Sequence, residues 1–500
     1  MSNETKTSLA AVKRAQRRPL TQDGLSKAYQ QSTAATAGLT YYDLQPGALS
    51  LYPVTTPLRN RIPRVGTGRG VQANWRAVTG ININSLGVGV SEGNRGGVIA
   101  TSTQDYMAAF RGLGLEDYVT FEADYAAAGF DDVKALAVNG LLRALMIGEE
   151  KVILGGNTSC PLGATPNPTV ADAATGGSLP ANSAVSVRVA ALTLEGYLGS
   201  SVIGGVRGQV SRSNADGSSD SYGGGTAKMS AGASVTTAND GSASHKLTAT
   251  VAPVTGAVGY AWFWGASGSE VLGAITTINS LIITAAATGT QTAASLGGND
   301  NSVNGLVFDG LLTQIVKPGS NAYVYAMPTG AAGQGTPLTA DGVGGVVEID
   351  AALQHFWDAY RLSPTTIWVS SQEQINITRK VLQGSSNSAL RFSVGADQSN
   401  LAGGQMVTTY LNKFSMDGAK AINVLPHPNL PAGTILFDTE VLPYPLSGVA
   451  SLLQMKTRRD YYQIEWPVKA RRYEYGVYFD GVLQNYFPPA FGMITNIANG

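Results

Sequence analysis

The three histidines of this chain are the residues that would first be considered for acid–base or metal chemistry. His245 stands in a strand-like run, His355 follows a helical pattern, and His427 lies between two prolines. No metal-ligand spacing is visible around any of them. A structural role is therefore the better interpretation for each, and we expect a protein that is not an enzyme and that uses no cofactor or metal ion.

Two other motifs are explained without chemistry. The glycine-rich stretch at residues 66–70 lacks the Lys-Ser/Thr of a phosphate loop and does not stand between a strand and a helix. The carboxylate pairs Asp131/Asp132 and Glu149/Glu150 suit a helix end and a solvated helix face. The sequence contains no nucleophile elbow of the form G-x-S-x-G.

Composition narrows the class of protein further. The chain has 500 residues, which suggests two or three domains, and its formal net charge is zero, so no overall basic field recruits nucleic acid or a membrane. No apolar run is long enough for a signal sequence or a membrane span. Cys160 is the only cysteine, which excludes a disulfide framework. Stability must come from packing, assembly, or both.

The N-terminus is the one locally basic segment. Its basic residues are followed by Pro19 and include Lys13, Arg14, Arg17 and Arg18. Two interpretations stay open: a solvated tail, or a tail that contacts nucleic acid.

The middle of the chain is almost uncharged. Between residues 158 and 340 only 14 of 183 residues are charged, against 54 of the other 317. The block is rich in Gly, Ala, Ser and Thr, and strand-like runs at 183–198, 245–264 and 274–285 predict a β-sandwich. Trp262 and Trp264 alternate with Phe263, which predicts that one face of their strand is core. The run at 258–265 is similar to the central strand of fibronectin type III and bacterial immunoglobulin-like modules.

The residues before this block predict an arm, a hairpin and a long helix. A short helix is expected from Gln22 to about Ala35, followed by a proline-punctuated stretch that must lie along other surfaces. Alternation around a Gly-Asn-Arg-Gly-Gly turn predicts a long β-hairpin with a flexible tip, and the resemblance given below implies that it runs from about 70 to 125. The apolar spacing of 130–154 predicts a helix roughly 37 Å long, with Leu136, Leu141 and Leu145 on one face.

After residue 340 an α/β pattern returns. Helices are predicted over 346–360 and 371–383, with Ser370 or Ser371 as the cap of the second. A buried strand is predicted at 365–371, and further strands at 406–411, 421–425 and 434–438. The C-terminus interleaves arginine with tyrosine, which favours a packed sheet over a nucleic-acid surface.

The order of these elements resembles the major capsid proteins of tailed bacteriophages, which have the Hong Kong 97-type fold. The resemblance is carried by three segments: LEDYVTFEADYAAAGFDDVKALAVNGLLRALMIGEEKVILGGN, AALQHFWDAYRLSPTTIWVSSQEQ and RRYEYGVYFDGVLQNYFPPAFGMITNI. It implies an α+β chain with an all-β insertion and the following parts: N-terminal arm 1–69, extended loop 70–129, spine helix of the peripheral domain 130–165, immunoglobulin-like β-sandwich 166–300, axial domain 301–450, and peripheral-domain strands with the C-terminus 451–500.

The same resemblance implies the function and the partners. The chain would be a structural subunit that self-assembles into hexamers and pentamers of an icosahedral shell around double-stranded DNA, with the insertion decorating the outside. Scaffolding and portal proteins would be its partners, assembly would take place in the host cytoplasm, and a host-surface glycan is a candidate ligand of the insertion. The basic residues at 13–18 would face the packaged DNA. No membrane partner is expected.

Contacts between subunits would then carry the mechanism. Candidates for inter-subunit ion pairs share charge and a place in the loop or the C-terminal sheet: Arg95, Glu116, Asp117, Glu122, Asp124, Arg458, Arg459, Arg471 and Arg472. Each could equally be a solvated surface charge worth less than ~1 kcal/mol. Residues 71–130 contain no lysine, so the isopeptide cross-link of some family members is not expected. The alternative class is a surface-array or adhesive protein with an immunoglobulin-like module.

Overall fold

The computed structural model describes residues 7, 10, 54–82, 87–128, 132–214, 216–383, 406–415, 418–444 and 448–499. The chain divides into two compact units, Met1–Tyr52 with Glu122–Lys134 and Pro53–Phe121 with Ala135–Gly500. All of the sheets below belong to the second unit.

Three predictions concern residues outside the described ranges. They are the helix over 22–35, the part of the proline-punctuated stretch before residue 54, and the DNA-facing role of the basic N-terminal residues Lys13, Arg14, Arg17 and Arg18.

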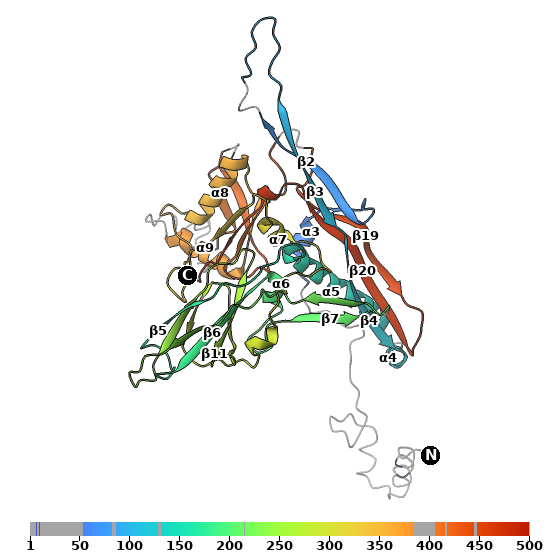
Figure 1. Ribbon diagram of the computed structural model, residues 1–500. Helices are drawn as coiled ribbons and strands as arrows, with labels where there is room; N and C mark the ends of the chain where they lie inside the picture. Colours follow the sequence, from blue (N-terminus) through green and yellow to red (C-terminus); the bar gives the residue numbers. More distant parts are fainter. Residues whose placement is uncertain are drawn as a thin grey trace, which may run out of the picture. The chain divides into compact units, whose positions relative to one another are not determined.

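A sheet of long strands has the order β1-β19-β20-β4 (Figure 1). Its strands are β1 (Arg64–Val65), β19 (Leu453–Glu465), β20 (Arg472–Asn485) and β4 (Arg111–Thr120). β20 pairs antiparallel with both β19 and β4, whereas β1 pairs parallel with β19. The aromatic C-terminal segment is thus a sheet, as predicted.

The expected hairpin is present as strands β2 (Gln72–Asn82) and β3 (Ala100–Ala109). Among the described strands these two pair only with each other, in antiparallel register from Gln72–Ala109 to Asn82–Ala100. The hairpin is shorter than expected, because the chain after Phe110 joins the long sheet as β4.

The long helix predicted over 130–154 is α5 (Val133–Gly155), which follows the shorter α4 (Phe121–Ala127). Leu141 and Leu145 are buried as expected, but Leu136 is 45% exposed. The buried face continues instead through Glu149 and Glu150, both fully buried. The prediction of a solvated carboxylate pair was therefore wrong, because partners from other segments surround both carboxylates.

Two antiparallel sheets form the middle of the chain. One has the order β13-β10-β5 and consists of β5 (Thr169–Ala173), β10 (Lys246–Thr250) and β13 (Ser280–Ile283). The other has the order β12-β11-β6-β9 and consists of β6 (Ala184–Leu192), β9 (Ala233–Thr236), β11 (Gly259–Gly265) and β12 (Val271–Thr276). Val187 and Trp262 of the second sheet and Leu247 of the first share one buried cluster. The sheets therefore pack face to face across a common core.

The predicted strands of this region are divided and change sheets. The run at 245–264 forms β10 in one sheet and β11 in the other, separated by a turn in which Gly256 has φ +86°. The run at 183–198 is β6 followed by helix α6 (Leu194–Leu198). Phe263, expected opposite the core, is buried in a second cluster with Leu272. β11 is covered on both faces, so the prediction of a single core face was wrong.

Smaller elements complete this region. Strands β7 (Gln209–Ser213) and β8 (Ser219–Gly223) form a two-stranded sheet, and η1 (Ala293–Leu296) is a 3₁₀ turn.

A mixed sheet has the strand order β14-β21-β18-β15-β17-β16. Its strands are β14 (Tyr323–Ala326), β15 (Thr366–Val369), β16 (Thr409–Asn412), β17 (Lys420–Pro426), β18 (Ile435–Asp438) and β21 (Gly492–Thr495). The accompanying helices are α3 (Pro57–Arg61), α7 (Leu311–Val316), α8 (Val347–Tyr360), α9 (Ser371–Gln383) and η3 (Pro488–Ala490). The predicted helices over 346–360 and 371–383 are confirmed as α8 and α9. Ser370 caps α9, since its hydroxyl accepts from the Glu373 N–H at 3.2 Å.

Candidate assembly site

The shaft of the β2–β3 hairpin exposes apolar side chains on both strands. Val78 and Met107 are both exposed. An ion pair between Arg76 and Asp105, 2.5 Å apart, crosses the hairpin, but both side chains are about two-thirds exposed, so water screens it and it adds little to the stability of the hairpin. A two-stranded hairpin is marginal by itself in water. The shaft therefore carries apolar surface that it cannot cover.

The tip of the hairpin, residues 87–99, is more exposed still. These described residues form no strand, and every one of them is exposed. Val88 and Val98 are 88% and 89% exposed, and Val90 and Ile99 are exposed as well. Arg95, a predicted inter-subunit contact, lies in this segment. Four exposed valine and isoleucine side chains within thirteen residues suggest a binding surface, although polar residues 91–95 lie between the two pairs.

A buried charge network surrounds Glu149 at the end of α5. The Arg59 Nε and Arg64 Nη1 atoms lie 3.0 and 2.8 Å from the Glu149 carboxylate oxygens. The Tyr461 hydroxyl also donates to this carboxylate, and burial beside Glu149 raises the pKa of Tyr461. Arg64 continues to Asp460 at 2.7 Å. Helix α5, β1 and β19 are thus joined by one carboxylate.

Glu150 forms a second buried contact with the start of α3. Its two carboxylate oxygens accept from the Leu58 and Arg59 N–H groups at 2.9 and 2.7 Å, which satisfies the free N–H groups of that short helix. His427 Nε2 lies 2.7 Å from Glu150, and its Nδ1 accepts from Asn429 N at 3.2 Å. His427 therefore carries its proton on Nε2 and donates to Glu150.

The two glutamates together hold residues 57–65 against α5, β19 and the mixed sheet. Sequence reasoning missed this network. The sequence does contain one sign of this network. Glu149 and Glu150 form a pair of carboxylates within a largely apolar part of the helix, between Ile147 and Leu154. Buried charges occur there only when they are paired. The arrangement is structural, because every charged group in it already has a partner within the described chain.

Five of the predicted contact residues belong to three strands of the long sheet. Glu116 and Asp117 are on β4, Arg472 is on β20, and Arg458 and Arg459 are on β19. The pairing of β4 with β20 brings the acidic and basic sets to one sheet.

Most of these charges find partners within the chain. Arg458 pairs with Asp480 at 3.0 Å and Arg472 with Glu474 at 2.6 Å. Glu116 accepts from the Tyr478 hydroxyl. The Arg459 guanidinium lies 4.0 Å from the centre of a tyrosine ring, that of Tyr462. Whether they also contact another subunit stays a prediction.

The remaining candidates lie near the ends of α4 and β20. Glu122 and Asp124 are on α4, and Asp124 pairs with Lys134 at 2.8 Å. The Arg471 carbonyl accepts from Phe121 N at 3.2 Å. Their roles between subunits also stay predictions.

The other two histidines have structural contacts. His245 lies between Asp172 and Asp240, with each ring nitrogen 3.0 Å from a carboxylate oxygen. The Asp240 hydrogen bond raises the pKa of His245, and the same bond lowers the pKa of Asp240 to about 2. Both nitrogens are therefore occupied. The His355 ring packs 5.1 Å from the ring of Tyr323.

Neither a metal centre nor a membrane span emerges from the described parts of the chain. No group of three or more His, Cys, Asp or Glu residues there could hold a metal ion. None of the helices described has the length and apolar character that crossing a membrane requires.

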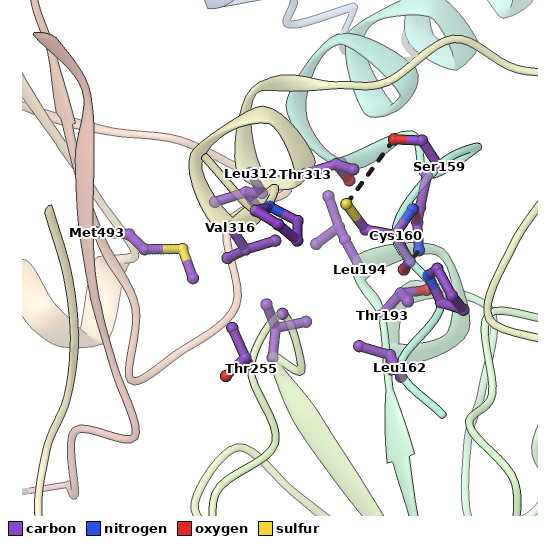
Figure 2. A pocket seen from close by; sticks show the side chains of 16 residues that line it. Ser159, Cys160, Leu162, Thr193, Leu194, Thr255, Leu312, Thr313, Val316 and Met493 are labelled. Carbon is purple, nitrogen blue, oxygen red and sulfur yellow. Dashed lines mark hydrogen bonds between the residues drawn. The ribbon is translucent and has the colours of Figure 1, made fainter. Parts of the chain in front are cut away.

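A cavity of about 310 Å³ lies beside the end of α5 and helix α7 (Figure 2). Leu194, Leu312, Val316 and Met493 give it apolar walls, and Cys160 is at its edge. Burial raises the pKa of the Cys160 thiol, so the sulfur stays protonated and is a poor nucleophile. None of the residues that line this cavity has a charged side chain.

Comparisons with known proteins give likenesses of fold. No family model matches the chain, and no curated protein matches it. The solved capsid of a native GTA particle is similar at 9% identity and a TM-score of 0.41, over 94% of this chain and 100% of that one. The capsid of the Myoviridae phage XM1 is similar at 9% identity and a TM-score of 0.40, over 92% and 99%. A Mycobacterium phage Che8 structure is similar at 8% identity and a TM-score of 0.38, over 93% and 99%. At such low identities and TM-scores these likenesses assign no function to this chain.

Proposed function

We propose that this chain is the structural subunit of a closed capsid shell, a major capsid protein of the tailed-bacteriophage kind with the Hong Kong 97-type fold. The observation that carries the proposal is the hairpin of β2 and β3, which pairs with no other described strand and exposes apolar side chains from its shaft to its tip. Such a segment is stable only when a second molecule covers it.

The contacts behind the hairpin suit a subunit that must hold its shape in a lattice. Glu149 and Glu150 fasten residues 57–65 to the long helix, and β4 and β20 continue the chain from the hairpin into the long sheet. The hairpin is therefore continuous with the long sheet, which these contacts join to α5.

The two packed sheets between 166 and 300 are the proposed insertion. They share one core, and the chain crosses from one sheet to the other several times, as in immunoglobulin-like modules. We place this insertion on the outer surface, where it decorates the shell and where a host-surface glycan is its candidate ligand. Deletion of residues 170–295 should leave subunits that still assemble; complete loss of assembly would show that the insertion braces the lattice.

The remaining parts of the proposal follow the resemblance. The shell consists of hexamers and pentamers, forms in the host cytoplasm with scaffolding and portal proteins, and encloses DNA that faces the basic residues at 13–18. A surface-array or adhesive protein is the competing class.

The test compares assembly of the wild-type chain with a variant that carries Asp at the exposed positions Val88, Val90 and Val98. The wild-type protein should sediment as large particles. The variant should keep its far-ultraviolet circular dichroism but stay a small species, because charge at the tip opposes burial in a neighbour. Unchanged particle formation by the variant would refute the role of the hairpin. A matched control with Asp at Val343, which is 76% exposed and outside the hairpin, should assemble normally.

A further inference from the structure

The imidazole of His245 lies at one end of the core that the two packed sheets of residues 166–300 share. Its backbone pairs with that of Leu179, just before β10 begins. Asp172 of β5 stands opposite Leu247 of β10, and side chains two apart on a strand share a face, so Asp172 and His245 lie on the same side of this sheet. Because Leu179 and Leu247 belong to the shared core, the ring and this carboxylate lie where the core ends.

The geometry fixes the protonation state of the His245 ring. Nδ1 lies 3.0 Å from Asp172 Oδ1, Nε2 lies 3.0 Å from Asp240 Oδ1, and the histidine side chain has no exposed surface. A ring nitrogen that faces a carboxylate must donate, and only the protonated ring has two N–H groups. The ring is therefore a cation between two anions.

The same carboxylates hold loop 237–244, which connects β9 to β10. Ala238 N donates to Asp172 Oδ2 at 2.9 Å, and Ser242 N donates to Asp240 Oδ1 at 2.9 Å. Residues 238–241 of this loop are exposed. The buried ring thus joins an exposed loop to a strand of the core.

Other charges are sparse around the ring. Loop 174–183, which contributes Leu179, contains no charged residue, and neither does the segment 284–290 after β13. Lys246 follows the histidine directly, and successive side chains of a strand point to opposite faces, so Lys246 faces away from the ring. Among these described surroundings only the proton of the ring balances the two carboxylates.

Loss of that proton breaks one of the two contacts. A neutral ring keeps one N–H group, so its other nitrogen would present a lone pair to a carboxylate at 3.0 Å in a buried place, which is unfavourable. Asp172 is held in a paired strand and is 16% exposed, whereas Asp240 stands in the loop and is 38% exposed. The contact with Asp240 therefore breaks first, and the loop moves away and admits water.

We infer that the Asp172–His245–Asp240 cluster is a pH-sensitive switch, which holds loop 237–244 closed in mildly acidic solution and releases it as the pH rises. The hydrogen bond with Asp240 raises the pKa of His245 above its ordinary value of 6.5. The stabilisation by this proton is therefore complete below pH 6.5 and is lost as the pH rises through the higher pKa of the folded state. On the acidic side the pKa of Asp240 is lowered to about 2, so its carboxylate stays charged in mildly acidic solution.

The loop lies at the free end of its sheet. β10 runs from this loop to Thr250, which stands opposite Ser280, and the neighbouring Asn279 N donates to Asn496 Oδ1 at 2.8 Å. The attachment to the C-terminal segment is thus at the other end of the strand. Opening of the loop changes the surface that the free end offers to a partner and leaves this attachment in place.

Hydrogen–deuterium exchange of the unassembled full-length chain, measured by mass spectrometry at about pH 6 and about pH 9, tests the switch. After correction for the intrinsic rate at each pH, peptides covering 237–247 should exchange at least about tenfold faster at the higher pH. D240N should lose this pH dependence, because an amide has no charge and can donate to a neutral ring or accept from a protonated one. The matched control D220N changes an aspartate of β8 that accepts from Asn214 at 2.9 Å, and it should behave as wild type.

Three results would overturn the inference. They are equal corrected rates at the two pH values, a pH dependence in D240N equal to that of wild type, and an acceleration that peptides of α8 share, which would mean global unfolding. The switch does not depend on the proposed function, and the measurement needs no particles. A chain that forms no shell would therefore refute the proposed function and leave this test intact.

Discussion

Replacing Glu149 with glutamine should destabilise the unassembled subunit by about 3 kcal/mol or more. The change keeps the size of the side chain and removes its charge. Arg59 and Arg64, whose side chains are 14% and 20% exposed, would then face each other across a neutral amide. Arg64 would keep its ion pair with Asp460, whereas Arg59 would keep only neutral partners, the Tyr461 hydroxyl and the Asn60 side chain.

The magnitude follows from burial. A single ion pair near 4 Å is worth about 4 kcal/mol at an effective dielectric constant of about 20, and Glu149 makes two at shorter distances. The cost of removing the charges from water offsets much of this gain, so loss of one partner from a buried network typically costs about 3–5 kcal/mol. The matched control is Glu474→Gln, which breaks the half-exposed pair with Arg472 and should cost less than ~1 kcal/mol.

The assay is urea denaturation of unassembled subunits, followed by far-ultraviolet circular dichroism, with the slope against urea compared between variants. A loss of less than about 1 kcal/mol in E149Q, equal to that of E474Q, would refute the reasoning. It would mean that the network behaves as a set of solvated surface pairs.

Three further predictions concern pH, the tip and covalent linkage. Burial raises the pKa of Glu373 from 4.5 to about 7. The folded state therefore binds the Glu373 proton more tightly than the unfolded chain does. The contribution of protonated Glu373 to the free energy of unfolding is complete below about pH 4.5 and is lost as the pH rises through 7. E373Q keeps an oxygen that accepts from Gly433 N. Urea titrations should show that it is more stable than wild type by about 3 kcal/mol above pH 7 and equally stable near pH 4. Equal stability of the two proteins at both pH values would contradict this prediction. Arg95→Glu should lower particle yield and thermal stability, and an unchanged particle would remove Arg95 from the contacts. Particles of the wild-type chain should run as monomers in denaturing electrophoresis, since residues 71–130 contain no lysine, and a ladder would show a cross-link of another kind.

Periodicity predicted the regular elements of this chain well. The helix of 133–155 and the two helices after residue 340 were visible because their apolar residues recur every three or four positions. The hairpin was visible because its strands alternate around a glycine-rich turn.

The features missed from the sequence depend on contacts between distant segments. Phe263 looked solvent-facing because alternation cannot distinguish a strand covered on both faces from one covered on one face. Tertiary packing decides at which residue a run such as 245–264 leaves one sheet and enters the other. Glu149 and Glu150 looked solvated because their partners, Arg59, Arg64 and His427, lie 85 to 277 residues away.

Electron microscopy of the purified full-length chain tests the central claim most directly. The proposed function predicts closed, roughly spherical shells of uniform size, built from rings of six and five copies with the hairpin of each subunit lying on a neighbour. Flat open arrays would instead support a surface-layer protein, and dispersed monomers at concentrations suited to assembly would contradict a shell-forming subunit altogether.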